Sequence, residues 1–272
     1  MNLLRHYLLA LQFFTRIPVT GRLAAWVGYS PAMLRASAAH FPGVGWLAGA
    51  LAAGSYGLAS LGLGPQAWTP LVAAVAATLA TVLMTGGFHE DGLADVADGL
   101  GGSLDRERAL DIMKDSRIGA FGAMALQLGL LSKLALLAWL GGAGLQTALA
   151  GLLLGHVLSR FWPLLLVRAL PHVGDTARSK SKPLADRISL AALAVAAGWT
   201  LPALALGAWW LGPTQALVAL LASALALAWM GRWFARRLQG FTGDCLGATQ
   251  QVCEIACYLG VALATAHPAL LT

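Results

Sequence analysis

Long apolar segments constrain the fold of this chain more than any other feature. A helix needs about 20 apolar residues to cross a membrane. Seven segments approach or exceed that length, at residues 43–63, 67–88, 119–140, 144–168, 188–211, 214–234 and 249–270. Only 11% of the residues are charged, whereas soluble domains have about 25%. The sequence therefore predicts an all-α integral membrane protein, one polytopic domain over residues 1–272 with about seven transmembrane helices.

The N-terminal residues 3–15 form a further apolar stretch ahead of these segments. Arg5 and His6 interrupt it, and no small-residue cleavage site follows, so we do not expect a secretory signal peptide. We expect a helix that lies in the membrane interface, with Phe13 and Phe14 reaching into lipid.

Charged residues are distributed unevenly among the connecting segments. The short turns near residues 62–66, 141–144 and 211–214 carry none. Every other connection carries Arg or Lys, and seven spans place all of these on one side of the membrane. The positive-inside rule identifies that side as cytoplasmic, so we predict a cytoplasmic N-terminus and cytoplasmic loops near residues 89–118, 171–187 and 235–248. The net charge of +6 has the same explanation, and we expect no nucleic-acid binding.

Acidic residues are concentrated in one of these loops. Eight of the 12 lie between positions 90 and 115: Glu90, Asp91, Asp95, Asp98, Asp105, Glu107, Asp111 and Asp115. If the second apolar segment continues as a helix past Phe88, three of them, Asp91, Asp95 and Asp98, share one face. Carboxylates aligned in this way repel one another unless a cation neutralises them. Such oxygen ligands suit Mg²⁺, Mn²⁺ or Ca²⁺, and a Mg²⁺ site implies a phosphorylated substrate.

The later acidic residues have a simpler alternative interpretation. Asp105, Glu107 and Asp111 alternate with basic residues, which is typical of a solvated loop. Asp91, Asp95 and Asp98 have no neighbouring base and follow a membrane segment directly, so the metal-site interpretation is favoured for them.

Two arginines at or inside membrane segments are candidate phosphate ligands. Arg117 lies where the third segment begins, and Arg160, next to Ser159, lies within the fourth. An ionisable residue inside a membrane helix is expensive and marks a functional site by default. The alternatives are an interfacial role for Arg117 and a side chain that extends to the cytoplasmic surface for Arg160.

Other polar residues leave more than one interpretation open. Lys133, near the middle of the third segment, has His156 or Glu254 as its candidate partner. The loop around Arg178 and Lys180 either closes over a diphosphate or contacts anionic lipid. Near the last segment, Asp244 either caps a helix or belongs to the site.

Several stretches resemble the cobalamin synthase family, the adenosylcobinamide-GDP ribazoletransferases. The most specific are His-Glu-Asp-Gly-Leu-Ala-Asp-Val-Ala-Asp-Gly, which begins at His89, and Asp-Ser-Arg-Ile-Gly, which begins at Asp115. The resemblance covers most of the chain, with further matching stretches at residues 13–18, 41–45, 159–160 and 242–248.

The resemblance implies the last step of adenosylcobalamin assembly. Adenosylcobinamide-GDP reacts with α-ribazole, or with its 5′-phosphate, and GMP is released. The resemblance also implies a Mg²⁺ cofactor and a location in the cytoplasmic (inner) membrane, surrounded by lipid. Whether the protein forms a homo-oligomer is left open.

This reaction assigns expected roles to the candidate residues. We expect Mg²⁺ to be held by Asp91, Asp95 and Asp98. Phosphate oxygens are expected to contact Arg117 and Arg160, and the base that takes the nucleophile's proton is expected to be Asp115 or Glu90. The expected substrate-binding residues are Arg16, Ser159, Arg178, Lys180 and Asp244.

Two other classes of membrane protein compete with this interpretation. CDP-alcohol phosphatidyltransferases also present Asp-Gly-x-x-Ala near a membrane surface, but Asp95 follows Ala94 where that motif has Arg, and the spacing to Asp98 is too short. Transporters place ionisable groups near the bilayer midplane, whereas only Lys133 is that deep here. We therefore favour the transferase.

Overall fold

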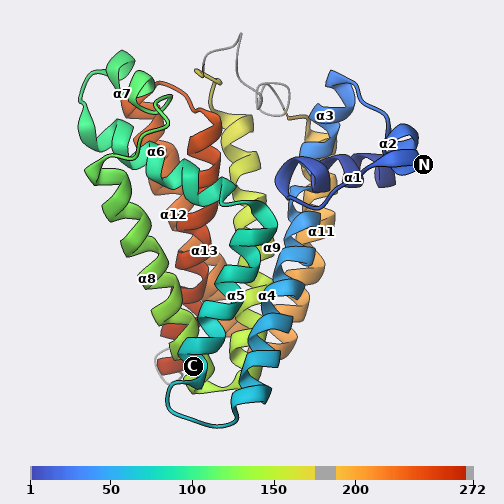
Figure 1. Ribbon diagram of the computed structural model, residues 1–272, viewed down its shortest axis with the longest axis vertical. Coiled ribbons are helices and arrows are strands. Elements are labelled where there is room, and N and C mark those ends of the chain that lie inside the picture. The colour runs from blue at the N-terminus through green and yellow to red at the C-terminus, as the bar shows by residue number, and fades with distance from the viewer. Residues whose placement is uncertain (1, 175–187, 268–272) are drawn as a thin grey trace.

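The structure is a computed structural model that describes residues 2–174 and 188–267, and these residues form a helical bundle (Figure 1). They contain no β-strand, only an isolated bridge between His172 and Phe241. The helices of 17 or more residues are α4 (Phe41–Leu63), α5 (Thr69–Thr85), α8 (Ala120–Ala143), α9 (Leu145–Ala169), α11 (Leu190–Leu211), α12 (Pro213–Arg237) and α13 (Gly243–Ala266).

Shorter helices gather at one end of this bundle, the upper end in Figure 1. They are α1 (Asn2–Phe14), α2 (Gly21–Val27), α3 (Pro31–Ser37), the 3₁₀ turn η1 (Ala38–His40), α6 (Phe88–Gly102) and α7 (Arg106–Ile112). The uncharged connection between α4 and α5 lies at the opposite end. Among the described residues, the charged connections and this uncharged turn therefore lie at opposite ends, as the sequence predicts.

The apolar helices make the described chain a multi-pass membrane protein. Five stretches are long and apolar enough to cross a membrane: Pro31–Leu63, α8, α9, α11 and α12. A sixth arises if α5 and α6 together form one bent span. The all-α membrane fold is thus confirmed. Helix α13 covers the seventh predicted segment but is not among these candidates, and it carries Asp244 and Glu254.

The core of the bundle is built around α9, most of which is buried. It packs against α4, α8, α11, α12 and α13. Close approach depends on small residues, since lipid supplies no hydrophobic force between helices. A Cβ atom at Gly45 of α4 would lie 2.6 Å from the backbone oxygen of His156 in α9, so only glycine allows this crossing.

The second predicted helix does not continue past Phe88. It ends at Thr85, and α6 begins at Phe88 after a bend of 88°. Gly86 and Gly87 both have φ of 70°, a left-handed conformation that glycine adopts without strain. Their N–H groups both donate to the Val82 carbonyl, at 2.7 and 3.0 Å. The chain therefore turns sharply, and α6 runs across the end of the bundle rather than along it.

Helix α1 forms where the sequence predicts it, but Phe14 at its end does not reach into lipid. Phe14 is buried and stacks on Phe41, with ring centroids 4.0 Å apart. Phe13 contacts both Phe14 and Phe88. The end of α1 is thus attached to the bend between α5 and α6, because these aromatic rings bury one another.

Candidate active site

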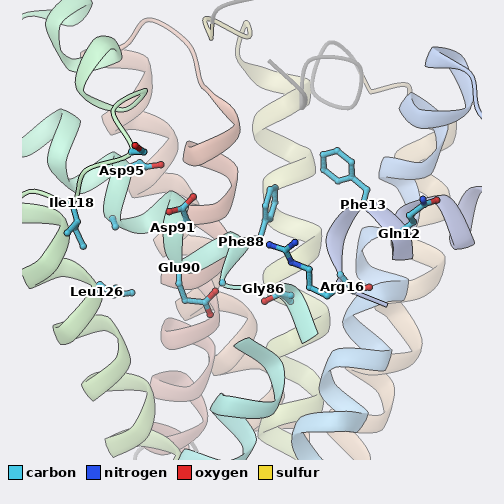
Figure 2. Close-up of a pocket in the computed structure, with 15 residues that line it drawn as sticks. Gln12, Phe13, Arg16, Gly86, Phe88, Glu90, Asp91, Asp95, Ile118 and Leu126 are labelled. Atoms are coloured by element: carbon cyan, nitrogen blue, oxygen red, sulfur yellow. The ribbon is translucent and has the colours of Figure 1, made fainter. Parts of the chain in front are cut away.

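A cavity of about 630 Å³ lies where α1, α6 and α8 meet (Figure 2). Its lining contains the predicted site residues Arg16, Glu90, Asp91 and Asp95. The remaining lining residues are Gln12, Phe13, Thr15, Thr85, Gly86, Gly87, Phe88, Ala94, Ser116, Ile118 and Leu126. The bend after α5 thus brings Arg16 and the acidic motif into one cavity.

The carboxylates of Asp91 and Asp95 lie one helical turn apart on α6, and Asp244 approaches them from α13. A Cβ atom at Gly92 would lie 2.8 Å from the backbone oxygen of Asp244, so this glycine allows α13 to come close. Burial, followed by the negative charges of Asp244, Asp91 and Asp98, raises the pKa of Asp95 to about 7. Burial also raises the pKa of Asp244, and Asp91 contributes. Like charges are therefore crowded here, which a bound cation would relieve.

Asp98 has a different environment from Asp91 and Asp95. It is 8% exposed, and its two oxygens accept the N–H groups of Gly119 and Gly122, each at 2.7 Å. These donors belong to the start of α8, whose first N–H groups have no partner within the helix. Asp98 therefore caps α8 from a neighbouring helix, and both of its oxygens are already engaged.

These positions bear on the predicted metal site. Within the residues that the structure describes, no three His, Cys, Asp or Glu side chains are arranged to hold a metal ion by themselves. Mg²⁺ commonly binds through one or two carboxylates, with substrate phosphates and water as its other ligands. Asp91 and Asp95, with Asp244 nearby, fit that description.

Arg16 supplies positive charge to the cavity wall. Its backbone N–H donates to the Met84 carbonyl at 2.6 Å, at the end of α5. A Cβ atom at Gly86 would lie 3.0 Å from Cζ of Arg16, so the guanidinium rests directly on that glycine. Cations are favoured at a helix C-terminus. The predicted substrate contact of Arg16 is therefore consistent with its place in the cavity.

Asp115 and Arg117 lie on the exposed segment between α7 and α8. Nη2 of Arg117 lies 2.5 Å from Oδ2 of Asp115, and the Arg117 side chain is 86% exposed. Hydrogen bonds from Arg117 lower the pKa of Asp115 to about 2. Neither residue lines the cavity, although their neighbours Ser116 and Ile118 do. This pair thus stands at the edge of the site.

Ser159 and Arg160 are brought into the bundle core rather than into the cavity. Arg160 is 2% exposed, and its Nη1 donates to the backbone oxygen of His156 at 3.0 Å. It does not extend to the surface. A phosphate contact would require Arg160 to leave these partners. Ser159 is fully buried and accepts a hydrogen bond from Gln250 at 2.9 Å.

The last helix contributes buried polar residues that are not among the predicted site residues. Gln250, Gln251 and Glu254 are buried on α13 and face α6 and α9. Their spacing could have indicated this cluster, because Gln250 and Glu254 are four residues apart in an otherwise apolar segment and so share one helix face. The Asp244 side chain does not cap this helix. Thr242 is the N-cap, and its hydroxyl accepts the N–H of Cys245 at 3.4 Å.

The later acidic residues match the solvated-loop interpretation. Asp105 caps α7 by accepting the N–H of Arg108 at 2.8 Å. Glu107 pairs with Arg106, and Asp111 pairs with Lys114, all on exposed or half-exposed side chains. They lie outside the cavity. Two other predicted substrate-binding residues, Arg178 and Lys180, lie outside the described residues.

Comparison with known proteins identifies relatives over almost the whole chain. A family model described as cobalamin-5-phosphate synthase matches residues 6–262. An adenosylcobinamide-GDP ribazoletransferase of Polaromonas sp. (strain JS666) is 64% identical over 95% of this chain and 96% of its own. Proteins of the same name from Leptothrix cholodnii and Vibrio cholerae are 50% and 42% identical, over 94% and 93% of this chain and 94% and 91% of their own.

No solved structure matches the chain. The family match and the relatives nevertheless agree with each other and with the acidic motif at the cavity. The chain belongs to the cobalamin-5-phosphate synthase family.

Proposed function

We propose that this protein joins adenosylcobinamide-GDP to α-ribazole, or to α-ribazole 5′-phosphate, and releases GMP. The product is adenosylcobalamin or its 5′-phosphate, so the reaction completes the nucleotide loop of the cofactor. One observation carries this proposal, namely the family match over residues 6–262. Relatives that are named for this transfer reaction and are up to 64% identical support it.

The reaction replaces a phosphoanhydride bond with a phosphodiester bond. A sugar hydroxyl of α-ribazole attacks the phosphorus atom nearest the corrinoid, and the bond from that phosphorus to the bridging oxygen breaks. GMP leaves with the bridging oxygen, and the hydroxyl proton passes to a base. Catalysis of such a step depends on positioning the reactants and on neutralising the phosphate charges.

The cavity contains groups that can neutralise the phosphate charges. Asp91 and Asp95 would hold Mg²⁺, with Asp244 beside them. When bound, Mg²⁺ supplies positive charge to the phosphate oxygens. Arg16 lies across the cavity from Asp95 (Figure 2) and would contact the same phosphates as a bidentate donor. The exposed Arg117 is the proposed contact at the edge of the cavity. Arg178 and Lys180, which lie outside the described residues, remain proposed substrate contacts.

Glu90 is the carboxylate that we propose as the base. It lines the cavity, whereas Asp115 does not. Asp115 is also a poor base because Arg117 lowers its pKa to about 2, so it holds a proton only weakly at neutral pH. The Oε2 atom of Glu90 is buried and has no hydrogen-bond partner among the described residues.

We also propose that the protein resides in the bacterial inner membrane with this cavity facing the cytoplasm. The helices around the cavity lie at the same end of the bundle as the charged connections that the structure describes (Figure 1). Basic connections are enriched on the cytoplasmic side. The bulky corrinoid would remain outside the bundle.

The direct test uses the full chain purified in detergent. Adenosylcobinamide-GDP and α-ribazole are supplied with Mg²⁺ or with EDTA, and cobalamin and GMP are separated by chromatography. Equal amounts of both products, formed only with Mg²⁺, are expected. Product formation in EDTA that Mg²⁺ does not increase would remove the metal from the proposal.

The absence of product from folded protein would contradict the transfer reaction itself. The same preparation would then be given a CDP-alcohol and a lipid acceptor, which tests the phosphatidyltransferase alternative. Reconstitution into liposomes, with uptake of adenosylcobinamide-GDP as the readout, tests the transporter alternative.

A further inference from the structure

Buried polar side chains connect the cavity to the centre of the bundle. Glu90 Oε1 accepts a hydrogen bond from Nε2 of Gln251 at 3.0 Å. The same nitrogen donates to Oε1 of Gln250 at 2.9 Å, and Nε2 of Gln250 donates to Oε2 of Glu254 at 2.6 Å. All four side chains are at most 9% exposed. The hydrogen-bond chain thus begins at a residue of the cavity wall and ends deep in the protein.

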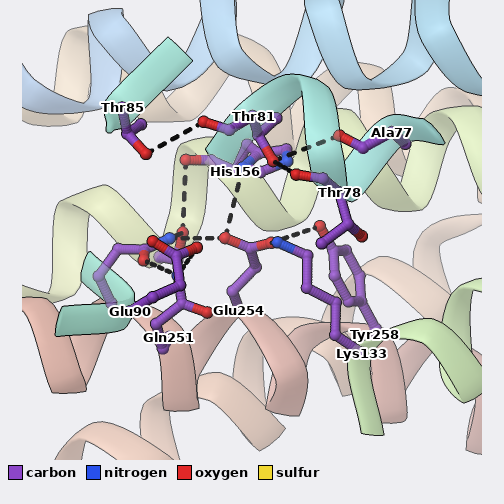
Figure 3. A network of polar contacts seen from close by, with 12 residues as sticks. Ala77, Thr78, Thr81, Thr85, Glu90, Lys133, His156, Gln251, Glu254 and Tyr258 are labelled. Carbon is purple, nitrogen blue, oxygen red and sulfur yellow. Dashed lines mark hydrogen bonds and ion pairs between the residues drawn. The ribbon is translucent and has the colours of Figure 1, made fainter. Parts of the chain in front are cut away.

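The far end of this chain is held by residues from two other helices (Figure 3). Lys133 Nζ of α8 lies 2.6 Å from Glu254 Oε1, and His156 Nδ1 of α9 lies 3.3 Å from Glu254 Oε2. The Tyr258 hydroxyl donates to Glu254 Oε1 at 2.9 Å. A buried charge is tolerated in an apolar bundle only when it is paired in this way. Glu254 is therefore fixed in position.

The two carboxylates determine how the amides between them are oriented. Each amide presents its nitrogen to an acid, Gln251 to Glu90 and Gln250 to Glu254. Gln250 is held additionally by Ser159. Reversal of either amide would place oxygen against oxygen in a buried environment, which costs the full desolvation of both groups. The Gln251 amide therefore has one favourable orientation.

The two carboxylate oxygens of Glu90 have different hydrogen-bond environments. Oε1 is bound to Gln251, while Oε2 has no partner in the part of the chain that the structure describes. We propose that Gln251 is a positioning residue for the transfer reaction. Its amide fixes Oε1 of Glu90 and so leaves Oε2 as the oxygen that would take the proton of the substrate hydroxyl, and Gln250 and Glu254 hold that amide in turn. This inference rests on the role proposed for Glu90.

Replacement of Gln251 by Leu tests the inference, because Leu occupies the side chain's volume without its hydrogen bonds. Misplacement of a catalytic group can cost up to about 100-fold in rate, so we expect kcat to fall about 10-fold or more while KM for both substrates changes little. The matched control is Tyr258→Phe, which removes a hydrogen bond from the other end of the same network. It should retain kcat. Equal kcat for Gln251→Leu and the wild type would overturn the inference.

An exchange of the two side chains separates positioning from simple attachment of α6 to α13. The double variant Glu90→Gln with Gln251→Glu keeps one carboxylate, one amide and their hydrogen bond. We expect it to regain the thermal stability that the single changes lose, but not the activity. Recovery of activity together with stability would mean that the pair only holds the helices together.

Two further outcomes distinguish this inference from the function on which it rests. Full activity of Glu90→Gln would remove Glu90 as the base and overturn both. An inactive Glu90→Gln beside a fully active Gln251→Leu would overturn only the positioning role. If Gln251→Leu does not fold, Gln251→Asn replaces it. Its shorter amide withdraws from Glu90, and an unchanged kcat for that variant would also overturn the inference.

Discussion

Asp95 and Asp98 lie three residues apart on α6, yet their surroundings differ. Asp95 faces the cavity among other carboxylates. Asp98 is buried against the start of α8, where a Cβ atom on Gly119 would come within 2.5 Å of Oδ1. Glycine at position 119 is therefore required for this capping interaction, because it gives the Asp98 carboxylate access to the backbone N–H groups.

This difference predicts opposite effects of two matched substitutions. Asp98→Asn leaves one acceptor oxygen for two buried N–H donors, so it should cost about 1–3 kcal/mol of stability and have little effect on Mg²⁺ binding. Asp91→Asn removes an exposed carboxylate, so it should weaken Mg²⁺ binding and leave stability nearly unchanged. Thermal unfolding in detergent and the Mg²⁺ dependence of the rate measure both quantities. Equal weakening of Mg²⁺ binding by the two changes would instead make Asp98 a metal ligand.

The sequence could predict the acidic motif, but not that Asp98 would cap α8 while Asp91 and Asp95 line the cavity. The spacing of Asp91, Asp95 and Asp98 follows from helix periodicity, a local property. The partners of Asp98 lie 21 and 24 positions further along the chain. Their contact depends on how the intervening α7 segment folds back, which no local pattern reveals.

At the scale of elements, the bend between α5 and α6 determines where the site forms. It directs the acidic motif across the bundle end and leaves the end of α5 open to Arg16. The sequence contained the signal in Gly86-Gly87, but a continuous helix preserved the carboxylate spacing equally well. The direction of α6 could therefore not be decided from periodicity.

Substitution of each glycine at the bend should separate backbone strain from the position of Arg16. Alanine at Gly86 or Gly87 must adopt a left-handed conformation, which costs about 1–2 kcal/mol. Only at Gly86 would the added Cβ meet the Arg16 guanidinium; at Gly87 nothing lies within 4 Å. We expect similar losses of thermal stability, but a larger rise in KM for adenosylcobinamide-GDP with Gly86→Ala. An equal rise in both variants would argue against a substrate contact by Arg16.

At the scale of the whole molecule, the separation of charged from uncharged connections predicts the orientation. Native Cys245, Cys253 and Cys257 are buried, so an added surface cysteine can be labelled selectively. Gln66→Cys at the uncharged end should react with a membrane-impermeant maleimide in intact cells. Leu104→Cys, at a residue 90% exposed in the charged connection after α6, should react only after permeabilisation. The reverse pattern would place the site outside the cytoplasm.

The buried network around Glu254 could be predicted from the sequence only in part. Hydropathy identified the apolar segments, and Lys133 was recognisable as a deep charge. Its partner remained open between His156 and Glu254, and the structure pairs it with Glu254 at 2.6 Å. That choice depends on how α8, α9 and α13 face one another, and apolar helices of this kind show little difference between faces in their sequence.

The shortness of α5 has a consequence for the surrounding bilayer. Its 17 residues rise about 25 Å, whereas the hydrocarbon core is about 30 Å thick. If α5 crosses the bilayer, we expect the membrane to thin beside this helix. Such hydrophobic mismatch makes activity sensitive to acyl-chain length. In liposomes of increasing chain length, we expect the transfer rate to be highest in the thinner bilayers. A rate that does not change with thickness would mean that the lipids near α5 need no adjustment.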